Sequence, residues 1–233
     1  MLLKINMVGL LKERVSEYLS NLNCNGLAIE IKEKHYETTV DVEGEGAICD
    51  EVIRELFTEF KPNIYGTNEE NIYKTVFELL KFKKLKLAIV EDVSAGRLCS
   101  ELIGANADVN DVLLEGIVCF SDESKCVRLG VDRNFFKTHS AKSVECSYEL
   151  ASGMIMTSPA DLVIATTGYS DESNLDYGKC YIAVGDKDFI HVFKHKFEGS
   201  KNHVLQQISK FAFLHLIKKL RENDFDFVEN VLY

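Results

Sequence analysis

The stretch LKLAIVEDVSAGRLCSEL (residues 85–102) decides the fold of the larger part of this 233-residue chain. Its apolar run ends at Glu91 and Asp92, and the small-residue turn VSAG (residues 93–96) follows before amphipathic spacing resumes. A strand end, a tight turn and a helix start are how α/β enzymes present a nucleophile. The residue at the tip is an aspartate, so the stretch predicts either an active site or the remains of one.

Outward from this stretch, apolar and amphipathic periods alternate along the chain. They predict strands at residues 85–90, 114–120, 161–165, 180–184 and 189–196. They predict helices from a cap at Thr67 or Asn68 to Phe82, and at residues 94–103, 143–157 and 203–222. The first two of these strands are nearly all apolar, which is typical of parallel strands buried on both faces. We therefore expect an α/β fold, a three-layer α/β/α sandwich with a mixed sheet, over residues 65–233.

The first part of the chain has a different order of elements. Strands are expected at residues 2–7, 27–31 and 38–42, and helices at residues 10–22 and 48–60. This β-α-β-β-α order predicts a small, separate α+β domain over residues 1–64, with the boundary near YGTNEEN (residues 65–71). The order is compatible with a KH-like fold, whose RNA contacts need a G-x-x-G loop. The acidic EGEG segment (residues 43–46) argues against RNA binding.

Composition narrows the classes of protein to consider. The net charge of −10 predicts repulsion from nucleic acid. The seven cysteines are scattered and never spaced as C-x-x-C, which argues against a disulfide framework and a zinc site. No apolar run approaches the roughly 20 residues of a membrane span, and the N-terminus lacks a signal-peptide pattern. We expect a cytoplasmic protein that binds neither membrane nor metal.

Four segments resemble, in order, motifs of the CinA C-terminal domain family. LKLAIVEDVSAGRL (residues 85–98) is similar to L-T-L-A-T-A-E-S-C-T-G-G, and GIVCFSDESKCVRLGV (residues 116–131) to G-V-V-A-Y-S-N-E-A-K-x-x-L-L-G-V. THSAKSVECSYELASGM (residues 138–154) and ADLVIATTGYSD followed by YGKCYIAV (residues 160–184) resemble the later motifs. The unit ending in IYG (residues 64–66) resembles the small domain that precedes this one in longer CinA proteins. Their larger molybdopterin-binding-like domain has no counterpart in this sequence.

The resemblance implies a nicotinamide-nucleotide amidase, which cleaves the carboxamide of nicotinamide mononucleotide and releases ammonia without a cofactor. The family uses a Ser–Lys pair, in which a neutral lysine takes the proton of the serine hydroxyl. Carried over by motif, the nucleophile falls on Asp92, the lysine on Lys125, and a tyrosine on Phe120. The resemblance also implies a homodimer.

Other positions of the implied site are partly retained. Ser121, Thr167 and Gly168 match polar or backbone positions of the substrate site, and Lys201 is the basic residue that follows the last strand. The segment YSDESNLD (residues 169–176) replaces a Gly-rich loop with an acidic one, which disfavours a phosphorylated substrate. A polar site for a small nucleotide-like ligand therefore stays open as an expectation.

The positions at which this sequence differs from the family motifs are those that the amidase reaction needs. An aspartate beside Lys125 favours the charged form of the amine, and a charged amine is no general base. We therefore expect a degenerate centre in which Asp92 caps the next helix or pairs with Lys125. The alternative is an active amidohydrolase that uses Ser94 or Asp92 with Lys125.

Overall fold

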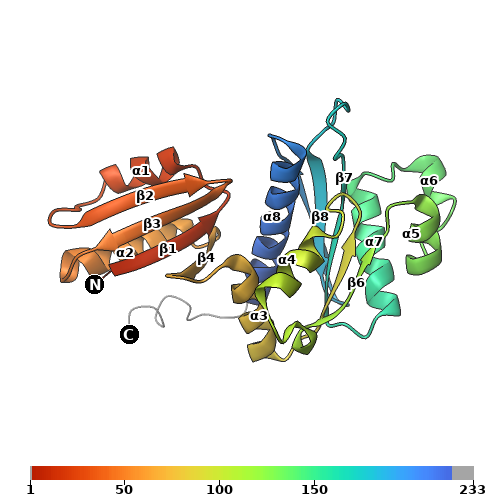
Figure 1. The fold of residues 1–233 in the computed structure, drawn as a ribbon, viewed down its shortest axis with the longest axis horizontal. Coiled ribbons are helices and arrows are strands. Elements are labelled where there is room, and N and C mark those ends of the chain that lie inside the picture. Colours follow the sequence, from red (N-terminus) through yellow and green to blue (C-terminus); the bar gives the residue numbers. More distant parts are fainter. Residues whose placement is uncertain (1, 222–233) are drawn as a thin grey trace.

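The computed structural model describes residues 2–221 and contains two β-sheets in sequence order along the chain (Figure 1). The first has four strands in the order β2-β3-β1-β4, and the second has five in the order β6-β5-β7-β8-β9. These mixed elements confirm the predicted α/β fold class. The predicted helix end at residue 222 and the expected domain end at residue 233 lie outside the described residues.

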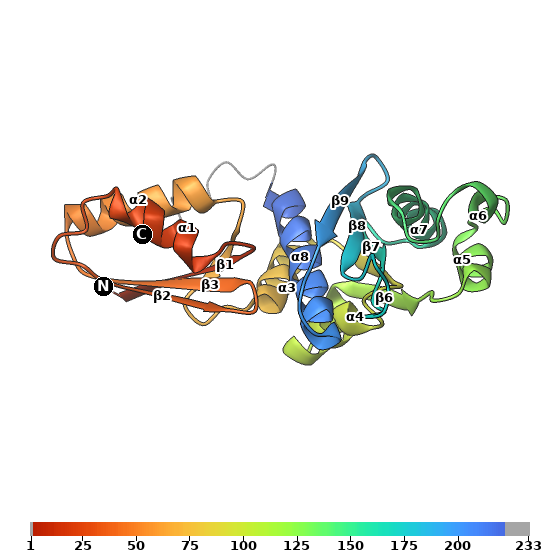
Figure 2. The same ribbon diagram turned by 90° about the horizontal axis from the view of Figure 1, so that it is seen from above.

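The four-stranded sheet is entirely antiparallel and carries its helices on one face (Figure 2). Its elements are β1 (Leu2–Val8), α1 (Lys12–Ser20), β2 (Ala28–Lys34), β3 (Glu37–Glu43), α2 (Ala47–Phe60) and β4 (Ile64–Thr67). Buried apolar side chains of β1, β3, α1 and α2 form its core. The sequence did not predict β4, whose four residues are too few to show a period. The expected boundary between residues 64 and 65 falls inside this strand.

The five-stranded sheet is mixed, with β5, β6 and β7 parallel and β8 and β9 antiparallel. Its strands are β5 (Leu87–Glu91), β6 (Leu113–Val118), β7 (Leu162–Gly168), β8 (Lys179–Gly185) and β9 (Ile190–Lys196). Its helices are α3 (Ile72–Lys83), α4 (Arg97–Ala105), the short η1 (Val109–Asp111), α5 (Asp122–Leu129), α6 (Phe135–Thr138), α7 (Val144–Thr157) and α8 (Lys201–Arg221). Helices α3, α4 and α8 cover one face, and α5 and α7 lie on the other (Figures 1 and 2). This is the expected three-layer sandwich.

Two local expectations are wrong. All five residues of β5 are buried, as predicted, but β6 is mostly exposed because it is an edge strand of the sheet. An apolar run does not encode the position of its strand in the sheet order. Helix α3 is capped by Asn71, whose side chain accepts the N–H of Lys74, whereas Thr67 belongs to β4 and Asn68 to the following turn.

Helix α8 joins the two units, because it packs on the five-stranded sheet and also contacts the first unit. Lys210 forms an ion pair with Glu37, and the ring of His203 lies 4.5 Å from that of His35. Arg221 donates hydrogen bonds to the carbonyls of residues 64 and 65 at 2.8 and 3.0 Å. No helix in the part of the chain that the structure describes is long and apolar enough to cross a membrane.

Candidate active site

The turn after β5 is held by the strands on both sides of it. The backbone N–H of Asp92 donates to the carbonyl of Thr166 on β7 at 3.1 Å, and the N–H of Cys119 donates to the carbonyl of Glu91 at 2.8 Å. Ala95 (φ 55°) and Gly96 (φ 88°) then take left-handed conformations in succession. This tight reversal leaves the Asp92 side chain inside the protein, with 3% of its surface exposed.

Glu91, which sequence reasoning missed, satisfies the start of α4. Its fully buried carboxylate accepts the N–H groups of Leu98 at 3.1 Å and Cys99 at 2.9 Å. These donors lie at the N-terminus of α4, where backbone N–H groups lack partners within the helix. The expectation that Asp92 caps α4 is therefore wrong, since Gly96 occupies the cap position. The only signal in the sequence was an acid at the end of a fully apolar strand.

Asp92 and Lys125 form a buried ion pair. The start of α5 is fixed by the hydroxyl of Ser121, which accepts the N–H of Ser124 at 3.1 Å, and Lys125 follows within the first turn. Its Nζ lies 3.0 Å from Asp92 Oδ2, and only 1% of Lys125 is exposed. Asp122 Oδ1 lies 3.7 Å from the same ammonium nitrogen, so two carboxylates face one cation.

The other oxygen contacts of this ion pair come from β7. Thr167 Oγ1 lies 2.8 Å from Asp92 Oδ2 and 2.9 Å from the carbonyl of Ala141, so its single proton has two acceptors within reach. Nearby, burial raises the pKa of the Cys146 thiol to about 12, with smaller opposed contributions from the two charges of the ion pair. The thiol is therefore protonated at neutral pH and does not act as a nucleophile there.

Ser94 lies in the same turn but has a different partner. Its hydroxyl is 2.7 Å from Thr166 Oγ1, and both side chains are fully buried. A serine nucleophile needs a base within hydrogen-bond distance. The group that Ser94 contacts is another hydroxyl, which does not act as a base at neutral pH.

Two of the remaining expected residues, Gly168 and Phe120, lie outside the hydrogen bonds that hold the ion pair. Gly168 (φ 156°) ends β7, and an added Cβ would lie 2.3 Å from the carbonyl oxygen of Lys179, so the position requires glycine. Phe120 is 71% exposed, between β6 and α5. Within residues 2–221 no hydrogen bond or ion pair joins either residue to the buried ion pair.

Lys201 follows the last strand, as the motif suggested, and contacts the acidic loop. It begins α8, is exposed, and its backbone N–H donates to Glu172 Oε1 in the acidic loop (residues 169–176) at 2.8 Å. It also helps to lower the pKa of Asp171, although the hydrogen bonds from Ser173 contribute more. The structure thus brings Asp92, Lys125 and Thr167 together and leaves Lys201 with the loop. Across residues 2–221, no group of three or more His, Cys, Asp or Glu side chains is arranged to hold a metal ion.

Comparison with known proteins identifies the family of the chain. The model of the CinA C-terminal domain matches residues 69–220. A CinA-like protein of Thermotoga maritima is 27% identical over 176 residues, which cover 74% of this chain and 43% of that protein. A relative from Caldicellulosiruptor saccharolyticus is 27% identical over 211 residues, 87% of this chain and 51% of its own length. The chain thus spans about half the length of these relatives.

Solved structures extend the comparison to the fold. A competence-damaged protein (CinA) superfamily protein from Klebsiella pneumoniae superposes with a TM-score of 0.60 at 28% identity, covering 66% of this chain and 99% of that one. A protein of the same superfamily from Escherichia coli also gives 0.60 at 28% identity, covering 64% and 89%. With the family model matching well over half of its residues, the chain belongs to the CinA competence/damage-inducible family.

Proposed function

We propose that this chain is a CinA-family protein whose amidase centre has lost its catalytic chemistry. The buried ion pair carries this proposal. A lysine that acts as general base needs a free lone pair, and an ammonium group that donates to a carboxylate has none. In this chain the lysine of the family's Ser–Lys pair is Lys125, and its Nζ is 3.0 Å from Asp92 Oδ2.

The energetics of the ion pair support the same conclusion. Removing one partner of a buried ion pair leaves an uncompensated charge, which costs about 3–5 kcal/mol. Freeing Lys125 to accept a proton would therefore require Asp92 to find another partner, and Thr167 offers a single hydroxyl. The carboxylate itself is a poor amide nucleophile while it is held by an ammonium and a hydroxyl.

The alternative, an active amidohydrolase, has less support from the contacts. Ser94 is fully buried and bonded to Thr166, so it would have to leave that partner before it could attack a substrate. Phe120 supplies no hydroxyl at the position where the family motif has a tyrosine. The acidic loop and the net charge of −10 would also repel the phosphate of nicotinamide mononucleotide.

Ammonia release from nicotinamide mononucleotide tests the proposal directly. We expect no release above background from the wild-type chain, and little from Asp92→Ser, because Phe120 and the acidic loop remain. Ammonia release by the wild-type chain that Lys125→Ala abolishes would overturn the proposal and favour the amidohydrolase.

Calorimetric titration of the same sample tests the expected nucleotide-like ligand, since saturable binding without turnover would assign the site a binding role.

We further propose that the chain forms a homodimer through its C-terminal domain. The apolar edge strand β6 supports this, since Leu114 and Val118 are exposed there and Phe120 follows them. An exposed edge strand whose one charged side chain is Glu115 leaves most of its backbone edge available for pairing with another chain. Light scattering at micromolar concentration should give the dimer mass for the wild type and the monomer mass for Val118→Lys. A monomeric wild type would contradict the proposal.

A further inference from the structure

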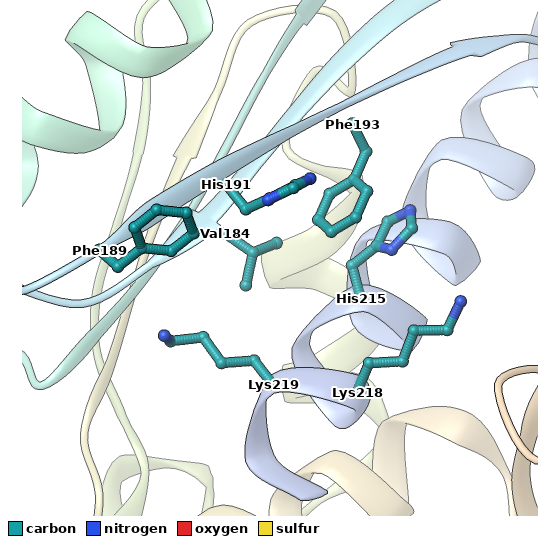
Figure 3. A pocket seen from close by; sticks show the side chains of 7 residues that line it. All are labelled: Val184, Phe189, His191, Phe193, His215, Lys218 and Lys219. Atoms are coloured by element: carbon teal, nitrogen blue, oxygen red, sulfur yellow. The ribbon is translucent and has the colours of Figure 1, made fainter. Parts of the chain in front are cut away.

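A second cluster of polar side chains lies on the other face of the five-stranded sheet, between β9 and α8. It surrounds a pocket of about 190 Å³. We call this the β9–α8 pocket. It is lined by Val184, Phe189, His191, Phe193, His215, Lys218 and Lys219 (Figure 3). The buried ion pair lies with α5, on the α7 side of the sheet, so the two clusters share no residue.

The walls of the β9–α8 pocket are apolar and aromatic. Phe193 stacks on His215 with ring centroids 3.5 Å apart and lies 4.4 Å from the ring of His191. Val184 lies next to His191 on the neighbouring strand β8, and Phe189 at the rim is 64% exposed (Figure 3). A concave, mainly apolar site with a few polar groups is the usual form of a small-molecule pocket.

His215, at the inner wall of the pocket, pairs with His195, which lies outside the pocket lining. His195 Nε2 and His215 Nε2 lie 2.8 Å apart, so one of these nitrogens donates to the other. Burial lowers the pKa of His195 to about 4 and that of His215 to about 2. At neutral pH the His215 ring therefore adds aromatic surface but no charge to the pocket wall.

Two lysines of α8 bring positive charge to the pocket, and they extend in opposite directions (Figure 3). Lys219 is compensated, because its Nζ lies 2.7 Å from Asp186 Oδ2. Lys218 is half-buried, and no carboxylate within residues 2–221 forms an ion pair with it. Because no ion pair offsets the cost of desolvation, burial lowers the pKa of Lys218. An uncompensated, partly desolvated cation at an aromatic pocket favours an anionic group on the occupant.

We propose that the β9–α8 pocket binds a small monocyclic aromatic carboxylate, with its carboxylate on Lys218 and its ring on the His215 side of the pocket, toward which Lys218 extends (Figure 3). A cavity of about 150 Å³ in another protein holds benzene, so a pocket of this size suits one substituted ring rather than a nucleotide. The aromatic walls favour a ring, and the uncompensated ammonium favours a carboxylate. This site is independent of the amidase proposal.

Benzoate is the probe, and the imidazole C–H resonances of the six histidines are the readout. On titration at pH 7, the resonances of His191 and His215 should shift saturably because they line the pocket. His35, His139 and His203 lie elsewhere and serve as internal controls. Benzamide, which has the same ring without the charge, should bind about tenfold more weakly or worse. Equal binding of benzamide, or no shift with benzoate, would overturn the proposal.

Two variants with the same change in charge locate the carboxylate. Lys218→Met keeps the length of the side chain and should weaken benzoate binding by about tenfold or more. Lys187→Met, on the exposed β8–β9 turn outside the pocket, should leave binding unchanged. Unshifted control histidines would show that each variant is folded. If both variants bound benzoate as the wild type does, Lys218 would not be the carboxylate partner and the proposal would fail.

Discussion

The two polar clusters of the five-stranded sheet differ in how their charges are compensated. Around the buried ion pair, Asp92 contacts both Lys125 and Thr167, and Asp122 lies beside the same ammonium. In the β9–α8 pocket, Lys218 forms no ion pair within residues 2–221, and His215 Nδ1 is buried without a hydrogen-bond partner. A lysine whose charge is paired resists rearrangement, because separating the pair is costly, whereas an unpaired lysine is available to a ligand.

The largest expected effect comes from making the same substitution in both clusters. Lys125→Met leaves Asp92 buried without its cation and should lower the free energy of unfolding by about 3–5 kcal/mol. Lys218→Met removes an uncompensated charge and should change it by less than about 0.5 kcal/mol. Urea denaturation measures both. The double variant Asp92→Leu, Lys125→Met should recover most of the loss, because an apolar pair of similar volume can replace an ion pair. Equal losses for the two single variants would erase the distinction between the clusters.

Acid should destabilise the protein through the His195–His215 pair. Both pKa values, about 4 and about 2, lie below the ordinary value of 6.5, so the unfolded chain binds more protons in this range. Stability is therefore full at pH 7 and falls as the pH drops from 6.5 towards 4, by about 3 kcal/mol for each histidine.

Urea titrations at several pH values test this contribution. The double variant His195→Leu, His215→Leu should lose most of the pH dependence between 6.5 and 4. The control variant His139→Gln changes an exposed residue outside the pair and should retain it. The contribution of the pair would be refuted by a double variant as acid-sensitive as the wild type.

The position of α5, which carries Lys125, depends on a close contact with α7. An added Cβ at Gly153 would lie 2.1 Å from the carbonyl oxygen of Leu129. Gly153→Ala should therefore separate the helices and destabilise the protein by about 1–3 kcal/mol. Gly104→Ala, in α4, meets no atom within 4 Å and should instead stabilise by about 0.5–1 kcal/mol. Thermal unfolding of the pair measures the difference, and the same sign for both would contradict the close-contact explanation.

The smallest effect concerns the turn that carries Asp92. Ala95 is exposed with φ 55°, a conformation that costs an L-residue more than glycine. Ala95→Gly should therefore stabilise the protein by about 0.5–1 kcal/mol without changing a side-chain contact. Ala105→Gly, at the last residue of α4, is the matched control and should destabilise. A melting temperature that falls for Ala95→Gly would show that the turn is unstrained.

Sequence reasoning found the layers of the fold and the residues that meet in the site. The turn at Asp92 and the position of Lys125 follow from local motifs, and parallel strands bring their carboxyl ends to one edge of the sheet. The role of Glu91 was missed, because its partners are backbone N–H groups that exist only once α4 is in place. The exposure of β6 was also missed, since sheet order depends on tertiary packing.

The β9–α8 pocket had no signal in the sequence. His195 and His215 are twenty residues apart, on a strand and a helix, and only the packing of α8 on β9 brings their rings together. Their spacing matches no metal or catalytic motif. Whether a buried polar side chain finds a partner is a property of the packed structure.

Because α8 contacts both the five-stranded sheet and the first unit, its place late in the chain affects the order of folding during synthesis. Residues 2–67, which form the four-stranded sheet, leave the ribosome more than 130 residues before Lys201 begins this helix. Only then can Lys210 pair with Glu37 at the interface between the units. Only then, too, can α8 cover its face of the five-stranded sheet. Such distant pairings are slow and leave apolar surface uncovered in the interval. The nascent chain should therefore need a chaperone most while the five-stranded sheet waits for its last helix.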